Sequence, residues 1–214
     1  MTVSAKAKAG IALLLALVPM ACAPAPDTAM NFATTLPATR WDHRPEADDW
    51  TRATLEALKA EGAPLLSTTP ADIATFCPGY AEAGPDQRAA FWAGMFSAIA
   101  KYESTWNPAA SGAGGRYLGL MQISPQTARG AGCDLSQGGL RDGASNLECA
   151  VRIAARRAPA GGGVVSGPGA LAGLTNDWGP MHKSGYTAEM AAWTKSQSYC
   201  QKPAAKPTRL AKVL

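Results

Sequence analysis

The sequence predicts one mainly α-helical domain with very little strand. Signals for helix starts and stops dominate residues 41–200, and alternating patterns typical of strands are scarce. The chain has 214 residues, of which 47% are hydrophobic and 17% charged, so it can bury a core of its own. A net charge of +4, with 20 Lys and Arg against 16 Asp and Glu, excludes a disordered chain and a strongly basic nucleic-acid-binding protein.

Helix boundaries follow from capping residues, from proline at first turns and from glycine at ends. Asp48 or Asp49 is expected to cap the first helix, and Ser145 with Glu148 three residues later has the spacing of a capping box. The predicted helices cover about 51–60, 70–76, 85–103, 125–129, 146–157 and 188–198. The best extended segment is 117–123, and 159–169 reads as a glycine-rich loop.

Residues 1–22 have the pattern of an export signal. Lys6 and Lys8 precede an apolar run, 10–18, that is too short to cross a membrane. Cys22 stands where a bacterial lipoprotein signal places its acylated cysteine, although Pro19 is unusual before it. Cleavage after Ala23 or Ala25 is the competing interpretation. Either way we expect an exported protein of the periplasm or cell envelope, an outer-membrane lipoprotein if Cys22 carries lipid.

The remaining chain divides into three parts. Residues 23–40 are rich in Ala, Pro and Thr and are predicted to be a flexible tether. Residues 41–200 form the domain, and 201–214 are predicted to be a disordered basic tail. The tail either is simply solvated or touches an anionic surface.

Four cysteines remain after the export signal: Cys77, Cys133, Cys149 and Cys200. An even number in an exported domain predicts two disulfides, and four cysteines allow three pairings. We favour Cys133–Cys149 as a local link and Cys77–Cys200 as a long-range one. No cysteine or histidine spacing matches a metal site, so neither a metal nor a cofactor is expected.

Glu103 is the candidate catalytic residue. Trp92, Phe96, Ile99 and Glu103 are spaced by four, three and four, which places the carboxyl on the apolar stripe of the longest helix. Burial and the negative end of the helix dipole both raise a carboxyl pKa, as a general acid at neutral pH requires. The alternative is a glutamate that has merely reached the surface at a fraying helix end.

The residues around Glu103 carry a resemblance to a known family. The run Glu103-Ser104-Thr105-Trp106-Asn107-Pro108 is followed by Gly119-Leu120-Met121-Gln122, and Asn146 opens a later helix. This order resembles the SLT-type lytic transglycosylases, which share the lysozyme-like α+β fold. The resemblance covers about 91–186. The loop 111–119 is longer than the common form, and the family's Ala-Tyr-Asn motif is replaced by residues 175–178, so Trp178 or Tyr186 would fill the place of its tyrosine.

The resemblance implies a peptidoglycan lytic transglycosylase. Glu103 would protonate the bond between N-acetylmuramic acid and N-acetylglucosamine and then act as a base, leaving 1,6-anhydro ends without a second carboxylate. Ser104, Met121, Gln122 and Asn146 would be substrate contacts, and Tyr117 and Trp178 are weaker additions, as flat rings suited to sugars. Purely structural roles remain open for Ser104, Met121, Gln122 and Asn146.

Three alternatives stay open. A lysozyme-like muramidase would use water and a second carboxylate, for which Asp134, Asp142 and Asp177 are candidates. A peptidoglycan-binding or assembly module would keep the scaffold without catalysis. The enzyme could also open gaps in the wall for an envelope machine, whose identity the sequence does not give.

Overall fold

The computed structural model describes Met1 and residues 35–161 and 173–202. The predicted export signal with Cys22, most of the predicted tether, the glycine-rich loop from residue 162 and the basic tail from residue 203 lie outside these residues. The predicted start of that loop is wrong, because residues 159–161 belong to a helix that ends at Gly161. Within them, no helix is long and apolar enough to cross a membrane.

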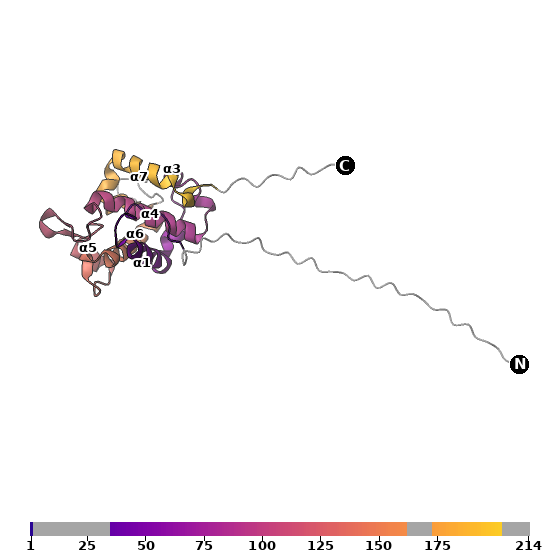
Figure 1. Ribbon diagram of the computed structural model, residues 1–214, viewed down its shortest axis with the longest axis horizontal. Helices are drawn as coiled ribbons and strands as arrows, with labels where there is room; N and C mark the ends of the chain where they lie inside the picture. Colours follow the sequence, from indigo (N-terminus) through magenta and orange to yellow (C-terminus); the bar gives the residue numbers. More distant parts are fainter. Residues whose placement is uncertain (2–34, 162–172, 203–214) are drawn as a thin grey trace.

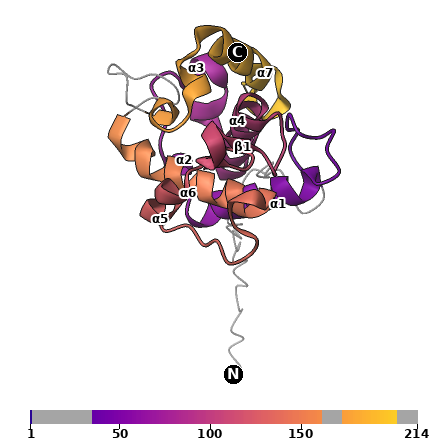
Figure 2. The same cartoon turned by 90° about the vertical axis from the view of Figure 1, so that its left-hand side faces the viewer.

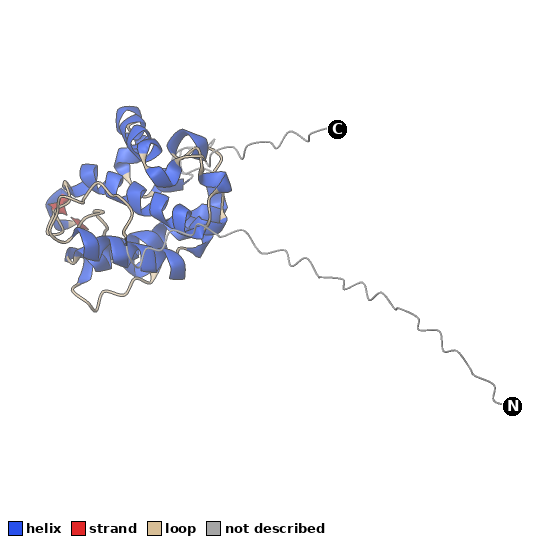
Figure 3. Cartoon of the chain, turned by 45° about the vertical axis from the view of Figure 1, so that its right-hand side comes forward, coloured by secondary structure: helices blue, strands red, loops and turns tan. Residues whose placement is uncertain are grey.

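The described chain is mainly α-helical, which confirms the predicted fold class. Its helices are α1 (Ala47–Ala60), α2 (Ala63–Ser67), α3 (Ile73–Phe76), α4 (Pro85–Ser104), α5 (Pro125–Ala131), α6 (Gly143–Gly161) and α7 (Ser184–Ser196), with short 3-10 turns between them. Two short strands, β1 (Ser111–Gly112) and β2 (Tyr117–Leu118), pair antiparallel. Figure 3 shows this small sheet in red at one end of the helical body.

Helix α4 forms the centre of the domain, with α3 and α7 on one side and α1 and α6 on the other (Figures 1 and 2). Every residue from Ala89 to Ala100 is buried, because an unusually apolar helix must be covered on all faces. The polar atoms of two core aromatic residues are hydrogen-bonded in series. Trp92 Nε1 donates to Tyr80 Oη at 2.9 Å, and Tyr80 Oη donates to the Leu65 carbonyl at 2.9 Å.

Several predicted helix starts are wrong by a few residues. Helix α1 begins at Ala47 after Glu46, so Asp48 and Asp49 lie in its first turn rather than capping it. The predicted capping box is also wrong, because α6 begins at Gly143. The Asp142 carboxylate accepts the Ser145 backbone N–H at 2.8 Å and takes the role expected of Ser145.

Residues 117–123 are not one extended segment. Leu118 and Ile123 exchange two backbone hydrogen bonds, so the chain reverses between them. The reversal requires left-handed backbone at Gly119 (φ 78°) and at Gln122 (φ 46°). Glycine meets the first requirement without strain, whereas glutamine adopts this conformation rarely.

The chain packs against the domain before residue 41. Tyr199 Oη donates to the Ala38 carbonyl at 3.1 Å, and Arg40 N donates to Ser97 Oγ at 2.9 Å. Thr39 is buried and Trp41 is fully inaccessible. The last residues of the segment that the sequence predicts to be a tether therefore lie on the helical body.

Both predicted disulfides are confirmed. Cys77–Cys200 joins positions 123 residues apart, and Gly79 N donates to the Cys200 carbonyl at 3.0 Å beside it. Cys133–Cys149 spans only 16 residues and ties the segment after α5 to α6. The long link closes a chain segment that contains α4 and the residues after it, while the short one acts locally.

Removing the long disulfide should destabilise the domain more than removing the short one. In the chain-entropy account, loops of these lengths correspond to roughly 5 and 3 kcal/mol. We expect Cys77→Ser/Cys200→Ser to lower the free energy of unfolding, measured in urea, by more than Cys133→Ser/Cys149→Ser does. Equal losses would show that the reduced chain keeps structure that the entropy account ignores.

Candidate active site

Glu103 lies in the last turn of α4, at the end of the stripe formed by Trp92, Phe96 and Ile99. Those three side chains are buried, and Glu103 is only partly accessible. Burial raises the pKa of the Glu103 carboxyl from 4.5 to about 7. The negative end of the helix dipole acts in the same direction.

The Glu103 carboxyl has no protein partner among the described residues, where it makes neither a hydrogen bond nor an ion pair. A carboxyl that is partly buried and unpaired loses hydration without compensation from the protein. A substantial share of it is therefore still protonated at neutral pH, and its proton is free for a bound molecule.

The chain turns sharply after Glu103. Thr105 and Trp106 both adopt left-handed backbone, with φ of 53° and 56°. Trp106 Nε1 donates to the Ser97 carbonyl at 2.9 Å, which anchors the turn against α4. Two consecutive left-handed residues without glycine cost free energy, so this turn is held by its surroundings.

Ser104 directs its hydroxyl back along the helix, where Oγ donates to the Ala100 carbonyl at 3.2 Å. The hydroxyl proton is therefore already used in a hydrogen bond within the helix, whereas the oxygen can still accept a hydrogen bond.

The turn 119–122 lies against the segment that follows Glu103, because Gly119 N donates to the Ala110 carbonyl at 3.0 Å. Gln122 folds over the turn and donates from Nε2 to the Gly119 carbonyl at 2.9 Å. A Cβ on Gly112 of β1 would come within 2.4 Å of Gln122 Oε1, so the amide occupies the space above that glycine. The second sequence motif therefore lies against the loop that directly follows the first.

Asn146 of α6 is fully buried, and its side chain forms hydrogen bonds with the backbone of this turn. Its Oδ1 accepts the Met121 backbone N–H at 2.8 Å, and its Nδ2 donates to the Leu118 and Leu140 carbonyls at 3.0 and 2.9 Å. A Cβ on Gly119 would come within 2.3 Å of Asn146 Nδ2, so the turn requires glycine for space as well as for its positive φ.

Trp178 closes the other side of the turn. Its Nε1 donates to the Met121 carbonyl at 3.1 Å, and its ring meets Phe96 of α4 edge to face at a centroid distance of 6.1 Å. Trp178 is 2% exposed and Met121 is inaccessible. Their side chains therefore belong to the core and do not present a face to a sugar.

The expected substrate contacts thus separate into two groups. Tyr117 is 41% exposed on β2, and Gln122 and Ser104 are partly accessible. Met121, Asn146 and Trp178 are buried and bond to the turn itself.

The three acids considered for a muramidase have structural partners. Asp134 accepts the Ser136 backbone N–H at 2.9 Å, Asp142 caps α6, and Asp177 pairs with Arg157 at 3.1 Å. The Glu103 pKa shift is caused by burial and not by a neighbouring charge. No group of three or more His, Cys, Asp or Glu in the described ranges is placed to hold a metal.

Sequence reasoning did not single out Tyr102 and Glu189, which lie with Tyr186 at the end of α4. Tyr102 Oη donates to Glu189 at 2.9 Å. The spacing of Tyr186 and Glu189 places both on one face of α7, a signal that was visible in the sequence. Nothing local in the sequence indicates that this face meets the last turn of α4.

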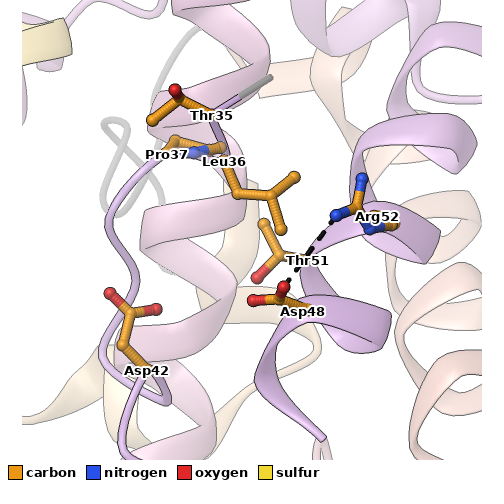
Figure 4. Close-up of a pocket in the computed structure, with 7 residues that line it drawn as sticks. All are labelled: Thr35, Leu36, Pro37, Asp42, Asp48, Thr51 and Arg52. Carbon is orange, nitrogen blue, oxygen red and sulfur yellow. Dashed lines mark ion pairs between the residues drawn. The ribbon is translucent and has the colours of Figure 1, made fainter. Parts of the chain in front are cut away.

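A pocket on another part of the surface lies between α1 and the segment before it (Figure 4), and an ion pair of 3.9 Å joins Asp48 and Arg52 there. Its lining residues are Thr35, Leu36, Pro37, Asp42, Asp48, Thr51 and Arg52. None of them belongs to the two motifs, so this pocket is not part of the candidate active site.

Residues 83–166 match the family model of the Transglycosylase SLT domain. The solved structure of Bd0314 DslA, wild-type form 2, is 27% identical, with a TM-score of 0.68 over 77% of this chain and 98% of that chain. Two DslA variants with a glutamate changed to glutamine are similar at 27% and 28% identity, with TM-scores of 0.67 and 0.68; each comparison covers 76% of this chain and 97% of the other. No curated protein is significantly similar to the chain.

The family match contains Glu103, the turn 119–122 and Asn146, which are the residues that carried the resemblance in the sequence. Over residues 83–166 the chain is therefore similar to the Transglycosylase SLT domain family.

Proposed function

We propose that the protein is a peptidoglycan lytic transglycosylase that cleaves the β-1,4 bond between N-acetylmuramic acid and N-acetylglucosamine and leaves 1,6-anhydro ends. The family match supports a transglycosylase activity on peptidoglycan. The observation that carries the proposal is the unpaired, partly buried Glu103 carboxyl, whose pKa is raised to about 7 by burial.

In the proposed reaction Glu103 first donates its proton to the glycosidic oxygen as the bond to C1 of the muramic acid breaks. The substrate's acetamido group stabilises the positive centre at C1, so the protein needs no second carboxylate. The Glu103 carboxylate then takes the proton of the same sugar's 6-hydroxyl, and the O6–C1 bond closes the anhydro ring. The carboxyl ends the cycle protonated, as it began.

The other candidate residues divide between contact and positioning in this proposal. Gln122, Ser104 and Tyr117 are accessible and contact the sugar strand. Met121, Asn146 and Trp178 position the turn that carries Gln122, since their hydrogen bonds are made to that turn.

A muramidase is the second candidate, and Asp134, Asp142 and Asp177 are its acids. Their structural hydrogen bonds and ion pair favour the transglycosylase. A non-catalytic binding module has no use for a carboxyl kept protonated near neutral pH.

The proposed substrate agrees with export. Peptidoglycan lies in the cell envelope, and the pattern of residues 1–22 predicts delivery there. We propose that lipid on Cys22 holds the enzyme at the membrane, close to the wall. Recovery of the protein from the soluble periplasmic fraction, beginning at residue 24 or 26, would contradict the lipid anchor and leave the activity untouched.

Replacing Glu103 by glutamine should abolish cleavage and leave binding of glycan strands intact, because the amide keeps the shape but cannot transfer a proton. Mass spectrometry of products from purified cell walls should show 1,6-anhydro ends with the wild type and none with Glu103→Gln. Reducing ends from the wild type would establish the muramidase, and full activity of Glu103→Gln would remove Glu103 from the site.

The decrease of kcat/KM at alkaline pH should follow the deprotonation of Glu103. With a pKa of about 7 the acid is protonated below that pH, so kcat/KM should fall about tenfold per unit above it. Folding raises this pKa from 4.5, so the folded state holds the proton more tightly. The free energy of unfolding of the wild type, compared with that of Glu103→Gln, should accordingly fall as pH rises from 4.5 to 7 and stay constant above pH 7. A rate independent of pH between 5 and 9 would contradict the acid role.

Replacing Asn146 tests its role as a positioning residue. Asn146→Ala leaves the Met121 N–H and the Leu140 carbonyl without their partner, at roughly 1–3 kcal/mol each, while the Leu118 carbonyl keeps its bond from Ile123 N. Urea unfolding should therefore show a loss of a few kcal/mol together with lost activity. Asn146→Asp keeps the acceptor for Met121 N and loses the donor to two carbonyls. Unchanged stability with lost binding in Asn146→Asp would instead indicate a direct sugar contact.

A further inference from the structure

Two tyrosines stack on the surface beside Glu103. The rings of Tyr102, on the last turn of α4, and Tyr186, on the first turn of α7, have centroids 4.1 Å apart and planes inclined by 14°. Tyr186 is 43% exposed, and its hydroxyl has no hydrogen-bond partner in the described part of the chain. Tyrosine is enriched at binding interfaces, because its ring offers a large apolar face beside a polar hydroxyl.

Glu189 fixes the inner ring of this pair. Its carboxylate accepts Arg40 Nη1 at 2.5 and 2.6 Å, Lys101 Nζ at 3.2 Å and Tyr102 Oη at 2.9 Å. Burial alone would raise the pKa of Glu189, but the hydrogen bonds from Arg40, Tyr102 and Lys101 outweigh it and hold the pKa below its ordinary value. The carboxylate thus stays charged and ties three chain segments together.

The same network holds Tyr102 in one orientation. Burial, together with the bond to Glu189, raises the pKa of the Tyr102 hydroxyl to about 12, so the hydroxyl remains a donor. Arg40 lies over the Trp193 ring at 5.6 Å, which links the network to the body of α7. Tyr102 is therefore held in one orientation, and Tyr186 stacks on it while staying 43% exposed.

The pair and the proposed acid lie at the same end of α4. Tyr102 directly precedes Glu103 in the last turn, so the two side chains leave the helix about 100° apart around its axis. A polysaccharide bound across Glu103 extends over several sugars and must contact surface on both sides of the acid. Sugar rings have apolar C–H faces that pack on aromatic faces, and rigid tyrosines lose little entropy when they bind.

We propose that Tyr186, supported by Tyr102, is a stacking platform for a sugar ring of the glycan strand next to the cleaved bond, and that Glu189 is the residue that positions it. The inference rests on the proposed function, since it takes the glycan strand as the ligand. It assigns a further part of the strand to the face formed by α4 and α7.

Binding is measured in the Glu103→Gln background, where no cleavage interferes. The probe is purified glycan strands free of peptide, titrated by calorimetry against Glu103→Gln alone and combined with Tyr186→Ala, Tyr186→Phe or Glu189→Ala. We expect Tyr186→Ala to weaken binding about tenfold, Tyr186→Phe to keep it because the ring is retained, and Glu189→Ala to weaken it by a smaller factor. Thermal unfolding of each variant is measured alongside.

Kinetics with Glu103 intact separate a platform from a structural pair. A platform holds the sugar equally in the ground and transition states, so Tyr186→Ala should raise KM about tenfold and leave kcat unchanged. A pair that merely joins α7 to α4 would lower Tm and leave Kd and KM unchanged, and that result would overturn the proposal. Absence of strand binding by Glu103→Gln itself would overturn it too.

The product analysis keeps the two proposals apart. Anhydro products together with unchanged binding by Tyr186→Ala would refute the platform and leave the transglycosylase in place. Weakened binding by Tyr186→Ala in a protein that yields no cleavage products would refute the enzyme and leave the platform.

Discussion

The unpaired carboxyl at the end of a buried helix is the constraint on which the site depends. Helix α4 is covered on every side, and that burial raises the pKa of Glu103 to about 7. A cation bound to the carboxyl would oppose this shift, and Glu103 pairs with none in the described part of the chain. Lys101, two residues before it, binds Glu189 instead.

The turn 119–122 depends on the same packing. Its left-handed residues are strained, and strain persists only where the surroundings fix the backbone. Here Asn146 from α6 and Trp178 bond to Met121 from two sides, and Trp178 also packs on Phe96 of α4. The helix that carries the acid and the turn that carries Gln122 are therefore joined through one aromatic contact, so their relative position is set by the core.

The sequence predicted the helical class and the position of Glu103 on its helix, because both follow from local residue spacing. It also predicted both disulfides, because four cysteines allow only three pairings. The predictions that failed concern residues whose contacts depend on the tertiary structure. Asp142 caps α6 in place of Ser145, since the chain before the helix adopts a turn that no short motif specifies. Met121, Asn146 and Trp178 looked like ligand contacts, yet they are buried, because polarity alone does not say whether a side chain faces a ligand or a strained backbone. The Tyr102–Tyr186 stack joins residues of α4 and α7 that only the fold brings together.

The distribution of carboxylates bears on the reaction itself. A hydrolase must hold a water molecule on the far side of the sugar from its acid, and a second carboxylate normally does so. The acids available for that task are committed: Asp142 to the start of α6, Asp177 to Arg157, and Asp134 to its own turn. Freeing one would expose a helix start, break an ion pair or unwind a turn. The intramolecular route needs none of this, because the substrate supplies both the stabilising acetamido group and the attacking hydroxyl. In the proposed ring closure the protein therefore has to supply one carboxyl with a pKa of about 7, and Glu103 supplies it.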